Sequence, residues 1–346
     1  MKAAIIQRPG ELVVREIHEP VIGDYDALCE ILYGATCTGT DGHLIHGRFP
    51  WGPIPHPTVL GHESVGRVIA LGAQVRNYRV GDLVTRVGAP ASPRGEYGSS
   101  WGGFAELGVA RDHWAMQADG LPEAQWKGWR WNQVLPPHFD PAAATMLTTW
   151  RETLSYLTRM GLKAGDTLLV IGSGGVGLSF AAFGALLGAA RVAALGNTRR
   201  AETARAVGVT DFFNYKEERV LNVMRAAFPA GFDLIVDSVG QRGSLNEVLP
   251  ALKPRGTAAI YGIDEFHEQQ LSPGRVRGGF TYYNGGYDEA ETHQRAIEMA
   301  LQGKLDARHW LNLDTPYPLA EIAEAFAALE RRELVKALIR VKQLTG

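Results

Sequence analysis

Hydrophobic and polar residues alternate in short runs along the first 150 residues. In the run 27–33, Ala27, Cys29 and Ile31 take every second position, as the residues on one face of a strand do. Further apolar runs lie at 64–71 and 83–85, and glycine and proline separate them. This punctuation is typical of strands joined by tight turns. We therefore expect the N-terminal part to be rich in β-structure.

The pattern changes near Pro141, where a helix is expected to begin and to end at Gly161. Apolar runs of strand length then alternate with segments of helical length. Strands are expected at 167–171, 191–195, 234–236 and 258–261, and helices at 176–188 and 200–208. Such alternation favours right-handed crossovers and a parallel sheet, and hence an α/β fold. The chain is expected to end with helices near 288–303 and 319–331 and a strand at 337–341.

Residues 88–131 fit neither pattern. They contain many glycines and polar residues together with five tryptophans, namely Trp101, Trp114, Trp126, Trp129 and Trp131. We expect a long loop or lobe here, and segments of this kind usually serve a function or an interface.

Composition narrows the class of protein. The chain has 346 residues, a net charge of −2 and 45% hydrophobic residues, which suggests two domains and excludes a disordered chain. The near-neutral charge argues against nucleic-acid binding. Two cysteines exclude a disulfide framework. The longest apolar run, 178–190, is too short to span a bilayer, and we expect no signal peptide, no membrane partner and a cytoplasmic location.

A glycine-rich loop follows the expected strand at 167–171 and opens an apolar helix. It fits the pattern GxGxxG and comprises Gly172, Ser173, Gly174, Gly175, Val176 and Gly177. The first glycine allows a tight turn, the second lets the backbone approach a pyrophosphate, and the third lets helix and strand pack closely. Because the motif lies between a strand and a helix, we predict a dinucleotide site rather than an ordinary turn.

The end of the second expected strand indicates which dinucleotide binds. An NAD site usually has a carboxylate there, on the ribose 2′-hydroxyl. This chain instead has Asn197, Arg199 and Arg200. Guanidinium groups pair well with a phosphate. We therefore predict NADP(H) in preference to NAD(H), although both arginines are also compatible with a solvated helix start.

A second group of reactive side chains lies in the N-terminal half. It comprises Cys37, Thr40, Asp41, His43, His62 and Glu63. Thiolate, imidazole and carboxylate are the ligand types that Zn²⁺ prefers. Spacing alone is weak support, because a single cysteine is more often a small buried apolar residue.

The chain resembles the medium-chain zinc-dependent alcohol dehydrogenase superfamily, and within it the polyol and sugar dehydrogenases. The resemblance covers essentially the whole chain. It is carried by the cysteine before Gly39-Thr40-Asp41, by Pro57–Gly66 with its Gly-His-Glu run, by Val80–Val84, the glycine loop, Asp237–Gly240 and Gly303–Asp306. It implies a GroES-like, β-rich catalytic domain at 1–148 and 286–346, and a Rossmann domain with a doubly wound parallel sheet at 149–285.

The resemblance also implies residue roles. Cys37, His62 and Glu63 would bind one catalytic zinc, with Glu63 as a ligand or an exchangeable neighbour. Asp41 would orient His62. Thr40 would accept the substrate proton and His43 would pass it on. Val239 and Lys336 would lie at the cofactor, with Lys336 near its phosphates.

Three departures from the family pattern affect the metal site. Thr38 is inserted between Cys37 and the Gly-Thr-Asp run, so we expect a bulge at Cys37. The usual fourth metal-site residue falls at Leu147 or Thr148, and the nearest carboxylate, Glu152, lies about one turn away. The segment 88–101 has none of the four cysteines that hold a structural zinc in many members. We therefore expect no structural zinc, with the tryptophan-rich lobe packing in its place.

The implied activity is hydride transfer between NADP(H) and a secondary alcohol and its ketone, or an aldehyde, most simply a polyol, sugar or cyclitol. Two alternatives remain: a zinc-free NADPH-dependent enone or quinone reductase, and a non-catalytic NADPH-binding protein. The expected partner is a small alcohol or carbonyl compound, and the expected assembly is a homodimer or homotetramer. Candidate substrate contacts are Trp51, Trp101, His46, Arg48, Glu96, Asn284 and Tyr287, although each polar one is also compatible with an ordinary loop role.

Overall fold

The computed structural model describes residues 1–342, which form two compact units. The β-rich unit comprises Met1–Thr148, His293–Leu301 and the segment that begins at Asp306. The parallel-sheet unit comprises Thr149–Thr292 and Gln302–Leu305. The chain returns to the β-rich unit after Thr292, which is later than the boundary at 285/286 that we expected, and residues 286–292 therefore belong to the parallel-sheet unit.

The parallel-sheet unit is a doubly wound α/β fold. Its six parallel strands lie in the order β11-β10-β9-β12-β13-β14. Their bounds are β9 (Thr167–Ile171), β10 (Arg191–Gly196), β11 (Asp211–Asn214), β12 (Phe232–Asp237), β13 (Leu252–Ile260) and β14 (Thr281–Tyr283). The order reverses between β9 and β12, and sheets of this kind bind ligands at the carboxyl ends of the strands beside the reversal.

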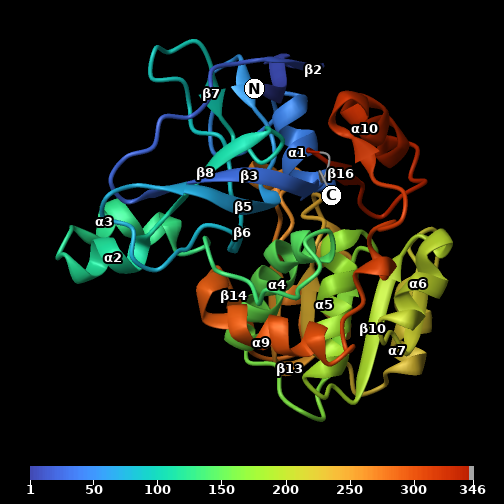
Figure 1. The fold of residues 1–346 in the computed structure, drawn as a ribbon. Helices are drawn as coiled ribbons and strands as arrows, with labels where there is room; N and C mark the ends of the chain where they lie inside the picture. The colour runs from blue at the N-terminus through green and yellow to red at the C-terminus, as the bar shows by residue number, and fades with distance from the viewer. Residues whose placement is uncertain (343–346) are drawn as a thin grey trace. The chain divides into compact units, whose positions relative to one another are not determined.

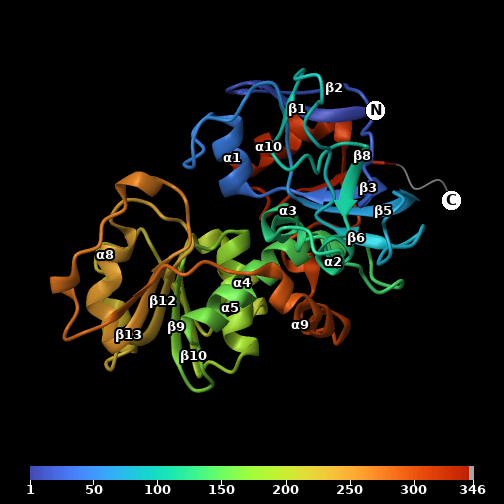
Figure 2. The same ribbon diagram turned by 90° about the vertical axis from the view of Figure 1, so that its left-hand side faces the viewer.

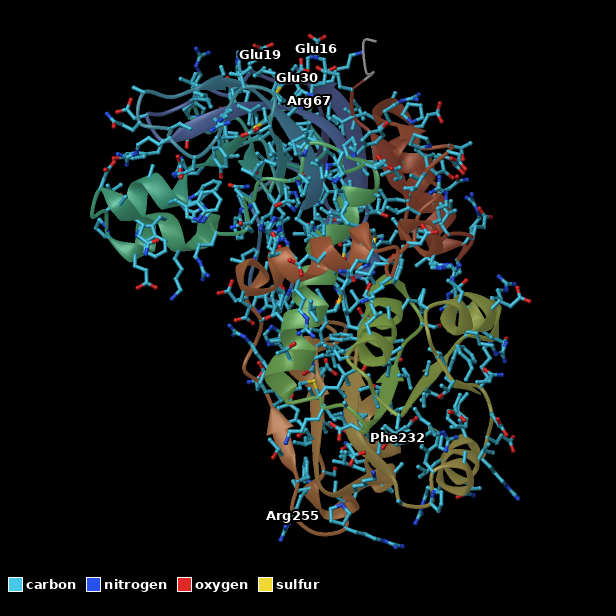
Figure 3. All side chains as sticks on the ribbon, turned by 60° about the horizontal axis from the view of Figure 1, so that its bottom comes forward. Glu16, Glu19, Glu30, Arg67, Phe232 and Arg255 are labelled. Carbon is cyan, nitrogen blue, oxygen red and sulfur yellow. The ribbon has the colours of Figure 1, made fainter. Side chains whose placement is uncertain are left out.

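Helices cover both faces of this sheet, with α5 on one face and α8 on the other (Figure 2). The helices of the unit are α5 (Gly175–Leu186), α6 (Ala201–Ala206), α7 (Val220–Ala227) and α8 (Ser244–Val248), and the unit boundaries fall within α4 (Leu147–Met160) and α9 (Glu289–Leu301). Burial on both faces explains why β9 and β12 are almost continuously apolar. Buried Phe232 starts β12, and exposed Arg255 lies in the first half of β13 (Figure 3). Both therefore lie towards the amino ends of the strands, whereas the glycine loop follows the carboxyl end of β9.

The β-rich unit contains two sheets. One has the order β2-β1-β4-β7, and the other has the order β15-β16-β3-β5-β6, with β8 also paired to β3. The strands are β1 (Lys2–Arg8), β2 (Glu11–Glu16), β3 (Asp26–Ala35), β4 (Thr58–Val59), β5 (Glu63–Leu71), β6 (Leu83–Thr85), β7 (Gly98–Ser99), β8 (Leu107–Arg111), β15 (Tyr317–Pro318) and β16 (Leu338–Arg340). Glu30 and Arg67 are partners in the β3–β5 register and lie together in Figure 3.

In the described part of this unit, these sheets are accompanied by α1 (Thr38–Ile45), α2 (His113–Ala118), α3 (Glu123–Trp126) and α10 (Ile322–Glu330), besides the ends of α4 and α9. Figure 1 shows α2 and α3 as a separate lobe at the left of this unit. The unit's main core joins Ile31 of β3, Leu44 of α1, Phe104 and Ile339 of β16, all essentially inaccessible to solvent.

The segment 88–131 is not one long loop. It contains β7, β8, α2 and α3, so of the two interpretations, a long loop or a lobe, the loop does not hold for these residues, whereas α2 and α3 form a lobe. The elements escape a periodicity analysis because the strands have two and five residues and the helices six and four. Two cation–π contacts hold the C-terminal end of the segment 88–131. The Arg111 guanidinium lies 4.5 Å from the ring centroid of Trp129, and the Arg86 guanidinium lies 4.9 Å from the ring centroid of Trp131.

No helix within residues 1–342 combines the length and the apolar character that crossing a membrane requires.

A buried ion pair joins α4 to α9 inside the parallel-sheet unit. Arg151 Nη2 donates to Glu289 Oε2 at 2.6 Å, and the two side chains are 0% and 6% exposed. Removing one partner of such a pair costs about 3–5 kcal/mol, because a charge stays buried without compensation. We expect Glu289→Gln to lower the free energy of unfolding by about 3 kcal/mol, measured by denaturant titration.

Glu268→Gln is the matched control, because Glu268 pairs with Arg242 at the surface. Such a change should cost less than about 1 kcal/mol. Equal losses in the two variants would contradict a stabilising role for the buried pair.

Candidate metal centre and dinucleotide site

Strand register brings the candidate metal ligands together. Ala35, the last residue of β3, pairs with Glu63, the first residue of β5. Cys37 lies two residues beyond Ala35, and His62 lies directly before Glu63. Gly61 precedes them with φ +107°, and a Cβ at this position would lie 2.6 Å from the Phe104 ring, so only glycine fits the turn.

Cys37, His62 and Glu63 each offer one ligand atom, and these atoms lie within 4.8 Å of one another. His62 Nε2 and Glu63 Oε1 are 3.8 Å apart. Two ligands at the usual zinc distances lie roughly 3–4 Å apart, so small side-chain movements would suffice to bind one ion. Both His62 and Glu63 are buried, whereas Cys37 is partly exposed. The donor chemistry and the spacing therefore fit one zinc ion.

Asp41 organises two of the three ligands. Its Oδ2 accepts a hydrogen bond from the Cys37 backbone N–H at 2.8 Å, and its Oδ1 lies 3.1 Å from His62 Nδ1. The side chain is completely buried. A carboxylate on Nδ1 leaves Nε2 as the nitrogen that faces a metal, which is the usual support for a ligating histidine.

The inserted Thr38 becomes the first residue of α1. Cys37 is the residue before the helix and has an extended backbone, with φ −112° and ψ 106°. Cys37 thus leads directly into α1, and Asp41 reaches back to its N–H. Thr40 and His43 follow three residues apart on α1, both partly exposed, and this spacing puts them on one helix face.

Lys336, which the resemblance places near the cofactor phosphates, is held beside the metal ligands. Its ammonium is buried, lies 2.5 Å from Glu63 Oε2 and donates to the Thr36 carbonyl at 3.0 Å. It belongs to the β-rich unit and is engaged beside the metal ligands. Sequence reasoning missed this contact because 273 residues separate the two partners. We therefore assign Lys336 to the charge balance of the metal centre.

The metal centre has a strongly negative character. Burial lowers the pKa of His62, but the Asp41 carboxylate and the Cys37 sulfur outweigh burial, and the net pKa lies well above its usual range. Lys336 shows the same balance. Burial lowers its pKa, but the nearby Glu63, Cys37 and Asp41 outweigh burial, so the net pKa is raised. Side chains that stabilise every nearby positive charge in this way favour a bound cation.

The residues near the usual fourth position do not complete the ligand set. Leu147 and Thr148 are buried at the start of α4. Glu152 accepts hydrogen bonds from Tyr261 at 2.9 Å and Tyr287 at 3.1 Å, all within the parallel-sheet unit. Two phenols therefore engage this carboxylate. A catalytic zinc site with three protein ligands keeps its fourth position for water or substrate.

Other candidate substrate contacts are engaged locally. His46 Nε2 lies 3.5 Å from Glu330 Oε1. Glu96 lies 3.4 Å from His18 and accepts a hydrogen bond from Ser92. Tyr287 donates to Glu152, as described above. These contacts give each of the three side chains a local structural role.

The glycine loop has the spacing that a dinucleotide requires. Gly172 has φ +104°, and Gly177 packs so closely that a Cβ there would lie 2.2 Å from the Gly172 carbonyl oxygen. A Cβ at Gly174, by contrast, would meet nothing within 4 Å. Gly174 precedes α5, which Gly175, Val176 and Gly177 begin and which no side chain caps. This open helix N-terminus fits a pyrophosphate.

The carboxyl end of β10 carries positive charge. Asn197 follows β10 and accepts the Arg199 N–H at 3.1 Å, and its own N–H donates to Ser173 of the glycine loop. Arg199 is exposed and Arg200 is partly buried. Burial and the neighbouring Arg199 lower the pKa of Arg200, and an anion would relieve this repulsion. The arrangement fits a 2′-phosphate.

Two further residues, Tyr215 and Val239, lie near the carboxyl ends of the strands that flank the glycine loop. The backbone N–H of Tyr215, which follows β11, donates to the Gly196 carbonyl at 3.3 Å. This exposed tyrosine therefore lies beside the carboxyl end of β10, which the two arginines follow. Sequence reasoning missed it because β11 was not recognised.

Val239 follows β12, donates its N–H to Asp237 at 2.9 Å, and lies against Gly172. Val239 is therefore at the reversal of the strand order.

Comparison with known proteins identifies the relatives of both units. The family described as the alcohol dehydrogenase GroES-like domain matches residues 23–122, and the family described as zinc-binding dehydrogenase matches residues 175–283. The L-galactonate-5-dehydrogenase of Escherichia coli (strain K12) is 26% identical over 349 residues and 98% of each chain. The L-threonine 3-dehydrogenase of Vibrio parahaemolyticus is 30% identical over 256 residues and 72% of each chain.

The same fold is found among solved structures. The alcohol dehydrogenase TADH from Thermus sp. ATN1 superimposes with a TM-score of 0.80 at 24% identity, over 99% of this chain and 100% of that one. This likeness establishes the shared architecture.

The position of Asp41 predicts the effect of changing it. Asp41→Asn keeps the size of the side chain but removes the charge that faces His62. Loss of such a partner typically lowers metal affinity about 10–100-fold. We expect a fall of this size in the affinity for Zn²⁺, measured by competition with a chromophoric chelator.

Asp119→Asn is the control, because Asp119 lies at the surface of the same unit and pairs with Arg76. Its zinc affinity should equal that of the unmodified protein. A zinc affinity that is unchanged in Asp41→Asn would show that Asp41 does not support the ligands.

Proposed function

Because the chain belongs to the zinc-binding alcohol dehydrogenase family with a GroES-like domain, we propose that it is an NADP(H)-dependent alcohol dehydrogenase. It interconverts a secondary alcohol and its ketone, and the substrate is a polyol, sugar or cyclitol. The observation that carries the proposal is the group of Cys37, His62 and Glu63 with Asp41 behind it. Relatives named for L-galactonate and L-threonine support a small hydroxylated substrate.

The residues of the β-rich unit have distinct tasks in this reaction. Cys37, His62 and Glu63 hold the zinc, which when bound supplies Lewis acidity that lowers the pKa of an alcohol hydroxyl. Thr40 accepts the hydroxyl proton, and His43 passes it towards solvent. Asp41 keeps His62 in the ligating orientation. Lys336 balances the charge of Glu63, which limits the repulsion among the three carboxylate and thiolate groups.

The residues of the parallel-sheet unit hold the cofactor. Gly174 and the start of α5 receive the pyrophosphate, Arg199 and Arg200 the 2′-phosphate, and Val239 contacts the nicotinamide end. NADP⁺ held by these residues would supply the acceptor for the hydride of the alcohol carbon. The alcohol thus loses a hydride and a proton, and the products are a ketone, NADPH and H⁺. Assembly as a homodimer or homotetramer and a cytoplasmic location are part of the same proposal.

The proton path predicts the effect of removing one hydroxyl group. Thr40→Val keeps the shape of the side chain and removes the proton acceptor, so kcat for NADP⁺-dependent alcohol oxidation should fall about 10²-fold or more. Thr38→Val is the control, because Thr38 is exposed on the same helix and should retain the original kcat. Zinc content, measured by mass spectrometry, should be equal in both variants.

Three results would contradict the proposed reaction. Equal kcat values in the two variants would remove Thr40 from the chemistry. Reduction of enones or quinones that survives Cys37→Ala would show a zinc-free reductase, and NADPH binding without any turnover would show a binding protein.

The arginines predict the cofactor preference. Charge-assisted hydrogen bonds contribute about 1.5–3 kcal/mol, so the Arg199→Ala/Arg200→Ala double variant should raise KM for NADP⁺ about 10-fold or more. KM for NAD⁺ should change less than about 2-fold, because NAD⁺ lacks the 2′-phosphate. Arg205→Ala, on the exposed side of α6, is the control. A parallel rise in both KM values would contradict recognition of the 2′-phosphate.

A further inference from the structure

Trp101 lies directly beside a metal ligand. Its ring centroid is 5.3 Å from that of the His62 imidazole, and the two planes are tilted by 52°. The indole is only partly buried. It is therefore a large side chain next to the atoms at which an alcohol would react.

The backbone holds this indole in an uncommon conformation. Trp101 has φ +64°, a left-handed value that bulky residues rarely adopt. Its carbonyl oxygen packs onto Gly88, where a Cβ would lie only 1.6 Å away, and the Gly102 carbonyl accepts the Ala89 N–H at 3.0 Å. Such strain persists only where the surroundings impose it, and it is concentrated at functional sites. The segment thus presents the indole as a fixed surface.

Two further aromatic residues continue this surface. Phe49 lies 6.2 Å from Trp101 with an interplanar angle of 80°, and Trp51 lies 5.0 Å from Phe49 at 72°. Trp51 is 60% exposed, whereas Phe49 and Trp101 pack on the buried core of the unit. We call Trp101, Phe49 and Trp51 the aromatic wall. It runs from the metal ligand His62 to the surface of the β-rich unit.

We propose that Trp101 determines substrate specificity and that the aromatic wall selects cyclic secondary alcohols over open-chain ones. The inference rests on the proposed dehydrogenase function. Neither His62 nor Phe49 stacks flat on the indole, as the angles of 52° and 80° show. The C–H face of a six-membered ring is flat and complementary to an indole, which offers a large contact area at low entropic cost. An open chain must freeze several torsions to present an equivalent face.

The test compares alcohols of matched size. Cyclohexanol is paired with 2-hexanol, and myo-inositol with sorbitol, so each pair differs in ring closure and the two pairs differ in hydroxylation. Trp101→Gly removes the indole at a position where glycine accepts the observed φ. We expect kcat/KM for the better ring substrate to fall about 10-fold or more, and kcat/KM for its open-chain partner to change less than about 3-fold. Whichever pair responds identifies the ring as a cycloalkanol or a cyclitol.

Controls separate specificity from folding and metal binding. Trp126→Ala removes an indole from the α2–α3 lobe of the same unit and should leave the ring preference unchanged. Trp101→Phe retains part of the flat surface and should shift the ring preference in the same direction but less, and it serves if Trp101→Gly does not fold. Zinc per chain should be equal in all variants.

A binding measurement distinguishes this inference from the proposed function. Calorimetric titration of the zinc-loaded protein with the ring alcohol needs no turnover, and the dissociation constant should rise in Trp101→Gly. If the unmodified protein oxidises none of the four alcohols but binds the ring alcohols through Trp101, the proposed reaction fails and the aromatic wall stands. Equal losses for ring and open-chain alcohols, or an unchanged preference, would overturn the role of Trp101.

Discussion

The pairing of Ala35 with Glu63 fixes the geometry on which the metal centre depends. Because β3 and β5 run antiparallel in this register, the chain leaving β3 and the chain entering β5 meet at one point. Cys37, His62 and Glu63 all lie within two residues of that pair. A shift of one residue would turn Glu63 to the other face of the sheet and separate the ligands. The long β3–β5 ladder, with its buried apolar residues, keeps this register.

Charge balance explains why these side chains tolerate burial together. With Cys37 as the thiolate that metals bind, the cluster holds three negative groups, Cys37, Asp41 and Glu63, against one positive group, Lys336. With His62 bound as a neutral imidazole, a divalent cation would bring the total to zero. A buried charge is costly unless it is paired, so the composition of the cluster itself favours a dication. Lys336 therefore supports the site without being a ligand.

Much of this organisation was predictable from the sequence. A period-two run indicated β3 and an apolar run indicated β5, and the alternation of strands and helices predicted the parallel sheet, because these elements are long and strongly patterned. The glycine loop was predictable because Gly172 and Gly177 have conformations or contacts that no other residue fits. Sequence pattern fails where elements are very short, as in β7 and α3, or only weakly patterned, as in β11.

Contacts distant in the sequence were not predictable. Lys336 lies beside Glu63 because β16 joins the sheet next to β3, and no local pattern encodes that pairing. The Glu152 carboxylate, near in sequence to the expected fourth ligand position, is held by Tyr261 and Tyr287 from later segments of the chain. The left-handed conformation of Trp101 depends on Gly88, thirteen residues earlier. Each of these features follows from tertiary packing rather than from local preference.

The most direct test of the account is the zinc content of protein purified without added metal, followed through chelation. The account predicts about one zinc per chain, removed by a chelator together with NADP⁺-dependent alcohol oxidation and restored with it. Alcohol oxidation at full rate in protein that contains no zinc would contradict the central claim that Cys37, His62 and Glu63 form a catalytic metal centre.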